Sequence, residues 1–243
     1  METNLDLTGK KAVVTGGGRG IGRAIALMLG QARATVLVTA RTEKEIEETA
    51  RLVREAGGTA IPVAADVSRE TDVDRLFRAV RDRLGGLDVL VNNAGLGVFG
   101  ELIKFSPADF DRVIAVNLRG TFLCCRHAME LMIPQRSGYI INISSVVGFK
   151  GYPKQSAYTA AKHGVMGLTK ALAVEAQPQG IRVSAILPGG VDTDLLRQAR
   201  PDLKPSELMS PDDVAQTVAF LLSLSDRAAV DEIYIRRRNS QPF

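Results

Sequence analysis

Tyr158 and Lys162 stand four residues apart, a spacing that could support acid–base chemistry. Positions i and i+4 of a helix lie on one face, so the phenol and the ammonium can point into one cleft. A phenol can give a proton to an alkoxide, but its ordinary pKa of about 10 is too high for easy exchange near neutrality. We expect the Lys162 cation to stabilise the phenolate and so to lower the pKa of Tyr158.

Gly16, Gly20 and Gly22 form a pattern that could bind a phosphate. They stand between an apolar strand-like run and a helical pattern, in the spacing Gly-x-x-x-Gly-x-Gly. Glycine allows a close approach that a Cβ would block, and the start of a helix presents free N–H groups and a positive dipole end. An ordinary glycine-rich turn is the alternative, but the strand before it and the helix after it favour a dinucleotide site.

The residues that end the next apolar run indicate which dinucleotide is bound. In dinucleotide-binding folds a carboxylate at this point binds the ribose 2′-hydroxyl, whereas this chain has Ala40 followed by Arg41. A guanidinium can hold a 2′-phosphate with two hydrogen bonds, and Arg19 in the glycine turn could make a second contact. Two solvated surface arginines are the alternative. Their position in the pattern favours NADP(H) over NAD(H).

The elements that must position these residues alternate between strand-like and helical segments. Strands without charged interruptions, separated by helices, indicate a parallel sheet covered on both faces, and right-handed crossovers make it doubly wound. We predict an α/β fold, a single Rossmann-type domain over residues 1–243 with a seven-stranded doubly wound parallel sheet and helices on both faces. The expected strands are 11–15, 35–40, 59–65, 87–91, 139–143, 181–186 and 232–235, and the expected helices are 21–31, 43–56, 70–84, 107–132 with a break near Asn117, 156–175 and 211–224.

The segment 192–210 is the least regular part of the chain, with two prolines and mixed polarity. A segment of this length without clear periodicity is often a functional lid, so we expect a short substrate loop here.

The composition excludes some classes of protein. Hydrophobic residues make up 45% of the 243 residues, enough for a sizeable core, yet the apolar runs are strand-sized and far short of a membrane span. The polar N-terminus shows no secretory signal. The net charge of +4 would permit a nucleic-acid surface, but basic residues are spread along the chain, which favours a scattered surface excess.

The cysteines and histidines indicate neither disulfide nor metal chemistry. Cys124 and Cys125 are adjacent and poorly placed to bridge each other, which indicates a reducing cytoplasm and buried helix residues rather than nucleophiles. His127 and His163 lack the carboxylate or cysteine spacing of a metal site, so we expect no metal.

Further residues that could take part in binding or catalysis follow the glycine turn along the chain. After the glycine turn come Asn92-Asn93-Ala94-Gly95, Asn117, Ser145, Tyr158, Lys162 and Pro188-Gly189, with Ser145 thirteen residues before Tyr158. In this order and spacing the chain resembles the short-chain dehydrogenase/reductase family over nearly its whole length, including its members that are similar to 3-oxoacyl-(acyl-carrier-protein) reductases.

The resemblance implies an NADP(H)-dependent oxidoreductase that interconverts a carbonyl and an alcohol by hydride transfer. It implies that Tyr158 is the acid/base, with the oxidised nicotinamide helping Lys162 to lower its pKa, and that Lys162 also binds the nicotinamide ribose. Ser145 would hydrogen-bond the substrate oxygen, and Asn117 would hold a water in a proton relay.

The resemblance also implies a set of cofactor contacts. It places Asp66 at the adenine, Asn92 near the adenosine side, and Val191 and Thr193 at the nicotinamide amide. For Asp66, a turn residue after the third strand is an equal alternative. The expected cofactor-binding residues are Gly16, Gly18, Arg19, Gly20, Ile21, Gly22, Arg41, Asp66, Val67, Asn93, Ala94, Gly95, Tyr158, Lys162, Pro188, Gly189, Val191 and Thr193.

Two features set this chain apart from many of the relatives. Where those relatives are glycine-rich after the seventh strand, this chain has 231–238 with three consecutive arginines, and its segment 192–210 looks shorter than in the oxoacyl reductases. Both regions border substrate or subunit contacts in the family. Ketone, aldehyde, hydroxy acid, sugar and steroid substrates therefore remain open.

The expected partners follow from the same reasoning. We expect a small-molecule carbonyl or alcohol substrate, no nucleic acid and no membrane. The resemblance implies a homo-oligomer, tetramer or dimer, because helices around 118–132 and 161–174 pair across subunits in the family. The rival hypothesis is a dinucleotide-binding regulator without turnover. The complete set of Ser145, Tyr158 and Lys162 argues against it, since sensing a cofactor needs no proton donor.

Overall fold

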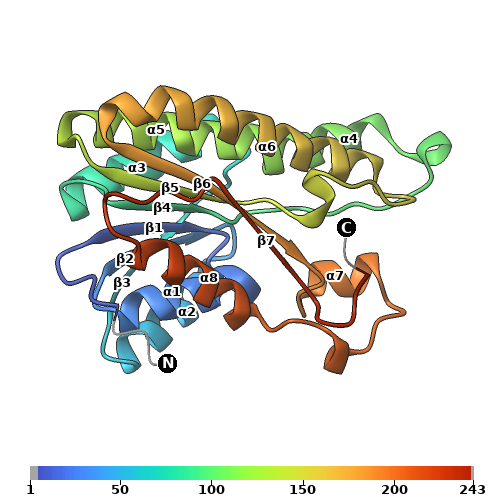
Figure 1. The fold of residues 1–243 in the computed structure, drawn as a ribbon, viewed down its shortest axis with the longest axis horizontal. Coiled ribbons are helices and arrows are strands. Elements are labelled where there is room, and N and C mark those ends of the chain that lie inside the picture. Colours follow the sequence, from blue (N-terminus) through green and yellow to red (C-terminus); the bar gives the residue numbers. More distant parts are fainter. Residues whose placement is uncertain (1–4, 242–243) are drawn as a thin grey trace.

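The protein is built on one parallel sheet, seen edge-on in Figure 1. The structure is a computed structural model and describes residues 5–241. In that range the sheet has seven strands in the order β3-β2-β1-β4-β5-β6-β7, and all neighbouring pairs are parallel. The strands are β1 (Lys11–Thr15), β2 (Thr35–Ala40), β3 (Thr59–Ala64), β4 (Val89–Asn92), β5 (Gly138–Ile143), β6 (Ile181–Gly189) and β7 (Glu232–Arg236).

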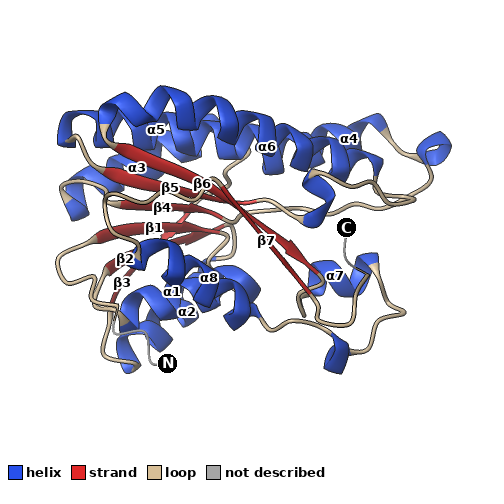
Figure 2. Ribbon diagram, viewed as in Figure 1, coloured by secondary structure: helices blue, strands red, loops and turns tan. Residues whose placement is uncertain are grey.

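Helices cover both faces of the sheet, as Figures 1 and 2 show. One layer contains α1 (Gly20–Gln31), α2 (Glu43–Glu55) and α8 (Pro211–Ser223). The other contains α3 (Glu70–Leu84), α4 (Pro107–Ile114), α5 (Gly120–Gln135) and α6 (Ser156–Ala176). The short α7 (Asp194–Ala199) lies beyond the end of β6. The predicted doubly wound α/β fold with seven parallel strands is confirmed.

Alternating side chains of each strand supply two cores. In β1, Val14 packs in the core under α1, α2 and α8, whereas Val13 packs in the core under α3, α5 and α6. Leu37 of β2 and Leu90 of β4 join Val13, and all three are fully buried. Burying one such side chain stabilises the fold by about 1.5–3 kcal/mol, so the uninterrupted apolar strands are what both helix layers require.

The strand order places a binding crevice at the carboxyl edge of the sheet. β1 pairs with β2 on one side and with β4 on the other, so the chain reverses its winding direction at β1. In open α/β sheets, ligands bind outside the carboxyl ends of the strands at such a switch point. The glycine turn follows β1, and Arg41, Asp66, Asn93 and Ser145 follow β2, β3, β4 and β5.

The boundaries of the elements differ from the predictions mostly at their ends. The helical stretch predicted over 107–132 is interrupted where we expected it, because a π-helical turn at Ala115–Arg119 separates α4 from α5. The expectation of an irregular segment over 192–210 was wrong in part. This segment contains α7 and a short 3-10 helix at Pro205–Glu207, and the Oγ1 of Thr193 caps α7 by accepting a hydrogen bond from the N–H of Leu196.

Candidate active site

A cavity of about 1150 Å³ runs along the carboxyl edge of the sheet. It extends from the loop after β2 to the chain that follows β7. The structure brings nearly all of the predicted site residues to this cavity, although their sequence positions span more than half of the chain. The predicted residues that line it are Gly16, Gly18, Arg19, Gly20, Ile21, Arg41, Asp66, Val67, Asn93, Ala94, Gly95, Ser145, Tyr158, Lys162, Pro188, Gly189, Val191 and Thr193.

The glycine turn has the geometry of a phosphate cradle. Gly16 has a φ of +63°, and a Cβ on it would lie 2.8 Å from the Cα of Ala94. α1 begins at Gly20, and no side chain caps this end of the helix. The first N–H groups of α1 are therefore free of side-chain acceptors and face the cavity end at which a phosphate would bind.

Gly22 is not among the residues that line the cavity, and its predicted contact with the cofactor stays a prediction. A Cβ on Gly22 would collide with the backbone carbonyl of Gly16 and with the amide of Asn93. The third glycine of the pattern therefore serves the packing of α1 against the turn and against the loop after β4.

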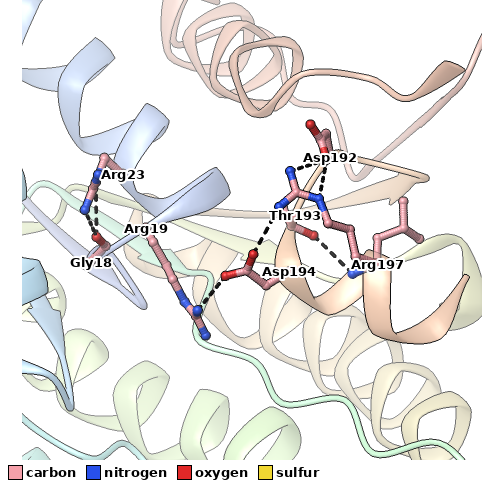
Figure 3. Close-up of polar contacts among 8 residues, drawn as sticks. Gly18, Arg19, Arg23, Asp192, Thr193, Asp194 and Arg197 are labelled. Atoms are coloured by element: carbon pink, nitrogen blue, oxygen red, sulfur yellow. Dashed lines mark hydrogen bonds and ion pairs between the residues drawn. The ribbon is translucent and has the colours of Figure 1, made fainter. Parts of the chain in front are cut away.

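The side chain of Arg23 holds the glycine turn through the carbonyl of Gly18, as Figure 3 shows. Arg23 donates from Nη2 to the carbonyl of Gly18 at 2.5 Å and from Nε at 3.1 Å. Thr49 of α2 donates to the same carbonyl at 3.2 Å. These donors satisfy the carbonyl of Gly18 within the protein and fix the conformation of the turn.

The two arginines expected at the 2′-phosphate have different surroundings. Arg41 is exposed and lines the cavity, and in the described part of the chain it forms no ion pair. Arg19 pairs with Asp194 of α7, with Nη1 and Oδ2 2.6 Å apart, across the cavity (Figure 3). Glu45 also lines this end of the cavity, next to Gly18, and the sequence reasoning did not single it out.

A small network fixes α7 at the opposite wall. Arg197 donates to Asp192 at 2.8 Å and pairs with Asp194 at 3.3 Å, so Asp194 is shared between Arg197 and Arg19 (Figure 3). The side chains of all these residues are 30–65% exposed. Ion pairs in such positions contribute little stability each, so this contact between the glycine turn and α7 can open readily.

Tyr158, Lys162 and Ser145 lie close to one another in the lining of the cavity. α6 begins at Ser156, so Tyr158 and Lys162 are one turn apart on its buried face, with exposed fractions of 8% and 4%. The ammonium of Lys162 donates to the carbonyl of Ile143 at 2.9 Å and lies 5.7 Å from the ring centroid of Tyr158. Ser145 is held at the end of β5, where its hydroxyl donates to the carbonyl of Pro188 at 3.5 Å.

Burial controls the acidity of both titratable groups. Desolvation raises the pKa of Tyr158 to about 12, and a hydrogen bond with Ser145 acts in the opposite direction. Desolvation also lowers the pKa of Lys162 to about 8. The expectation that the pKa of Tyr158 is lowered was therefore wrong for the groups of this chain. The cost of removing the phenolate from water exceeds the stabilisation that neighbouring side chains supply.

Asn117 lies behind the cavity wall rather than in it. The π-helical turn buries its side chain to 1% exposure, and its Nδ2 donates to the carbonyls of Leu96 and Val113, each at 2.8 Å. Its Oδ1 accepts from the N–H of Leu96 at 3.3 Å. The amide thus anchors the loop that carries Gly95, and the water relay stays a prediction.

Asn92 and Asn93, adjacent in sequence, point to different places. Asn92 is buried and donates to the Oδ1 of Asn142 at 2.9 Å, so its side chain does not line the cavity, and its position near the adenosine side stays a prediction. A strand alternates its side chains, and this one faces the α5 layer. Asn93 lines the cavity, and its Nδ2 donates to the carbonyl of Gly16 at 3.2 Å.

Asp66 fits both of the roles considered for it. It lines the cavity, and its Oδ1 accepts from the N–H and the hydroxyl of Ser68 at 2.9 and 2.7 Å. It is therefore a turn residue that also faces the expected adenine end.

Sequence reasoning missed the opposite end of the cavity. Lys150, Tyr152 and Arg200 line it, together with Arg237 and Ser240 from the chain after β7. The three consecutive arginines were the available signal, but their place beside the site depends on how β7 packs against β6.

The cysteines and histidines lie outside the cavity. Cys124 and Cys125 are buried and free, and burial raises the pKa of both thiols, which makes them poor nucleophiles as predicted. His127 is buried on α5 between Asp74 at 3.0 Å and Glu130 at 3.2 Å. Within residues 5–241, no group of three or more His, Cys, Asp or Glu side chains is placed to hold a metal ion.

Comparison with known proteins identifies the family. Residues 10–204 match the model of the short chain dehydrogenase family, and this chain belongs to that family. A 3-oxoacyl-[acyl-carrier-protein] reductase of Synechocystis sp. is 40% identical over 221 residues, 88% of this chain and 90% of the relative. A 3beta-hydroxysteroid dehydrogenase of Mediterraneibacter gnavus is 41% identical over 196 residues, 80% of this chain and 71% of the relative.

A solved structure shares the whole architecture. A metagenomic short-chain oxidoreductase, determined in complex with NADP, superposes with a TM-score of 0.84 at 38% identity, covering 95% of this chain and 98% of that one. The family resemblance predicted from the motifs is thus confirmed. In the part of the chain that the structure describes, no helix has the length and apolar character needed to cross a membrane.

Proposed function

We propose that this protein is an NADP(H)-dependent oxidoreductase that interconverts a carbonyl and an alcohol. The observation that carries the proposal is that Tyr158, Ser145 and Lys162 line the same cavity as the glycine turn. A proton donor is thereby placed in reach of a dinucleotide whose phosphates lie on α1. The bound cofactor would supply the hydride to the carbonyl carbon.

The residues of this chain would handle the proton and the oxygen of the substrate. With its pKa raised to about 12, Tyr158 is protonated near neutrality and can donate to the alkoxide that forms during reduction. The hydroxyl of Ser145 donates to the carbonyl of Pro188 at 3.5 Å, accepts from the N–H of Val147 at 3.3 Å and lies at hydrogen-bond distance from Tyr158. Exchange of the long bond to Pro188 would direct its proton to the substrate oxygen. Lys162, held by Ile143, places positive charge beside the phenol when it is protonated.

The cavity fits a dinucleotide that carries a 2′-phosphate. Gly16 leaves the space that a Cβ would fill, and the start of α1 has no side-chain cap. Ala40 provides no carboxylate to hold a free 2′-hydroxyl, whereas Arg41 is a cation without an ion-pair partner among the described residues. The structure of a short-chain oxidoreductase that is 38% identical to this chain was determined in complex with NADP, which supports NADP(H) over NAD(H).

Three further features complete the proposal. Segment 192–210 forms the substrate loop, since α7 lines the cavity opposite the glycine turn. The chain forms a symmetric homo-oligomer, supported by exposed apolar side chains on α5 and α6, where Phe122 is 47% and Val174 is 72% exposed. The protein works in the reducing cytoplasm, supported by two free cysteines.

An assay of NADPH oxidation across carbonyl classes tests the proposed reaction. We expect turnover with at least one class among ketones, aldehydes, oxo acids, sugars and steroids. A protein that binds NADPH but oxidises it with none of them, while shifting nucleic acid in an electrophoretic assay, would instead be the regulator without turnover.

A further inference from the structure

The cavity of this protein is more basic than acidic. Eight lysine and arginine side chains line it against four aspartate and glutamate side chains. Arg19, Arg41 and Lys162 belong to the dinucleotide and proton-transfer sites described above. Of the other five, Lys150 follows β5, Arg197 and Arg200 lie in and just after α7, and Arg236 and Arg237 stand where the chain leaves β7, a part of the sequence that departs from the family pattern.

Arg236 shapes this end of the chain. Its Nη1 donates to the carbonyl of Ser240 at 2.6 Å and to the carbonyl of Arg237 at 3.1 Å. The N–H of Ser240 also donates to the carbonyl of Arg237 at 3.1 Å. The chain from 237 to 240 is thereby folded into a tight turn against the cavity, and the guanidinium of Arg236 is used by backbone carbonyls.

Arg237 is held in the cavity wall by packing. Its side-chain stem covers the backbone of Gly190, since a Cβ on Gly190 would lie 2.7 Å from Cδ and 2.9 Å from Nε of Arg237. Gly190 has a φ of +70°, so a side chain there would be strained as well as crowded. Any other residue at position 190 would displace the arginine.

This position is close to the reacting centre. Ser145 contacts the carbonyl of Pro188, and Gly189 lies against Val146, with 3.5 Å from its ideal Cβ to the Cβ of Val146. Arg237 covers the next residue of the same turn. The glycine turn and Arg41, by contrast, follow β1 and β2, on the far side of β4 and β5 in the sheet.

A second cation lines the same end of the cavity from another element. The ammonium of Lys150 lies 5.6 Å from the ring centroid of Phe149 and 6.0 Å from that of Tyr234. The two rings pack edge to face at 5.1 Å. Cation–π contacts of this kind hold an ammonium in place without neutralising its charge.

Unlike Arg197 and Arg200, which also line the cavity, Arg237 and Lys150 lack an acidic partner among the described residues. Arg197 pairs with Asp192 and Asp194, and Arg200 pairs with Asp202 at 2.6 Å. Within residues 5–241, no carboxylate lies at ion-pair distance from Lys150 or Arg237. Asp202, the acidic group that Arg237 influences through space, is already bound by Arg200.

We propose that Arg237 and Lys150 bind an anionic group, a carboxylate or a phosphate, on the carbonyl substrate. Both side chains are half-buried, and a half-buried cation without a partner gains more from an anion than a fully solvated one does. This proposal rests on the proposed reaction, because a preference for anionic substrates is measured from turnover. Binding of an anion at Arg237 and Lys150 can also be measured without turnover.

Arg238 offers a matched control for the test. It is the next residue and carries the same charge, but it is exposed and does not line the cavity. Arg237→Gln and Arg238→Gln therefore change the net charge of the protein equally, and neither removes the backbone carbonyls that Arg236 uses. Lys150→Gln is the third variant.

The kinetic arm compares each anionic carbonyl with a neutral counterpart at saturating NADPH. The pairs are acetoacetate and levulinate against their methyl esters, and dihydroxyacetone phosphate against dihydroxyacetone. We expect kcat/KM to favour the anion in at least one pair, and Arg237→Gln to reduce that preference about ten- to a hundredfold. Arg238→Gln should leave it unchanged, and the neutral counterparts should react equally with all forms.

A binding experiment tests the anion site independently of the proposed reaction. Calorimetry of the NADP⁺-loaded protein with levulinate, and with phosphate alone, should give weaker binding for Arg237→Gln and Lys150→Gln than for Arg238→Gln. Failure of every carbonyl to react would overturn the proposed function, yet this binding difference would still be expected. Equal binding by all forms, wild-type preference for the neutral substrates, or loss of NADPH affinity in Arg237→Gln would each overturn the anion site.

Discussion

The ammonium of Lys162 and the carbonyl of Ile143 are joined by a 2.9 Å hydrogen bond inside the protein, and no carboxylate among residues 5–241 lies at ion-pair distance from this ammonium. Ile143 is the last residue of β5, so this bond ties the catalytic face of α6 to the edge of the sheet. One carbonyl satisfies one of the three ammonium protons. The other donors are left for the phenol side of the site and for a ligand.

The burial of Lys162 predicts how stability depends on pH. Its pKa is lowered to about 8 in the folded protein, so between pH 8 and the ordinary lysine value of about 10.5 the unfolded chain binds more protons than the folded one. The free energy of unfolding should therefore rise with pH in this window, by up to about 3 kcal/mol from this residue. Ionisation of Tyr158 in the unfolded chain acts in the opposite direction above about pH 10.

Lys162→Met isolates this contribution. Denaturant unfolding of wild type and variant from pH 7 to pH 10, without cofactor, gives the difference in slope directly. We expect the wild type to gain stability relative to the variant as the pH rises. Parallel curves would show that Lys162 keeps an ordinary pKa in the folded protein.

The same substitution tests the role of Lys162 in the reaction. Lys162→Met should weaken NADPH binding and abolish turnover together, and any residual rate of alcohol oxidation should show a shifted basic limb in its pH profile. Normal NADPH binding with an unmoved profile would contradict both roles.

Tyr158→Phe should cut turnover by about two to four orders of magnitude, which is the usual contribution of a positioned acid or base. NADPH affinity should barely change, because the ring that packs edge-on against Phe99 is kept and only the hydroxyl is lost. Steady-state rates beside a fluorescence titration with NADPH separate the two effects. A variant that retains more than about a tenth of the turnover would show that another group supplies the proton.

The proposed homo-oligomer rests on α5 and α6, where Phe122 and Val174 expose apolar surface. Sedimentation at micromolar concentration should give an assembly, and a tetramer is expected. Charged substitutions at these two exposed positions should dissociate it, whereas the same change at exposed Phe110 on α4 should not. A monomeric wild type would rule the oligomer out.

Sequence patterns predicted the site residues whose position is set by the helix, strand or turn that contains them. The glycine turn and the Tyr158/Lys162 pair are local patterns with a fixed structural context, so their place at the end of β1 and on α6 followed directly. Patterns failed where a role depends on what lies across the cavity. Arg19 was expected to be free for a phosphate, but its partner Asp194 stands 175 residues away in the sequence.

The sequence patterns also did not predict the direction of side chains at the ends of strands. Asn92 and Asn93 are identical in type, yet Asn92 at the end of β4 bonds to the buried Asn142, whereas Asn93, just after the strand, lines the cavity. The pKa of Tyr158 was predicted from the charges of Lys162 and the nicotinamide, without the burial that raises it in this chain. The site formed by Arg237 depends on Gly190, a contact that no motif contains.

Cofactor preference should reside largely in Arg41. Losing one charge-assisted contact costs about 1.5–3 kcal/mol, so Arg41→Ala should lower kcat/KM for NADPH about ten- to a hundredfold. The double change Ala40→Asp, Arg41→Ala should lower it further, because Asp repels the 2′-phosphate and offers a partner for the free hydroxyl. Initial rates with NADPH and NADH decide this. A wild type that prefers NADH, or a double variant with unchanged preference, would contradict the assignment.

The ion pair between Arg19 and Asp194 predicts that α7 competes with the cofactor for one of its cations. The 2.6 Å contact joins two side chains that are 65% and 51% exposed, and such a pair is worth at most about 1 kcal/mol. Asp194→Asn should release Arg19 and remove a carboxylate from the phosphate end of the cavity. NADPH should then bind up to about fivefold more tightly, with a steeper dependence on salt.

Asp202→Asn is the matched control, because Asp202 pairs with Arg200 away from the glycine turn and does not line the cavity. It removes the same charge and should leave the affinity for NADPH unchanged. Fluorescence titrations of wild type and both variants at several salt concentrations make the comparison. Weaker binding by Asp194→Asn would mean that the pair holds α7 in the position that the cofactor needs, and the proposed competition would be wrong.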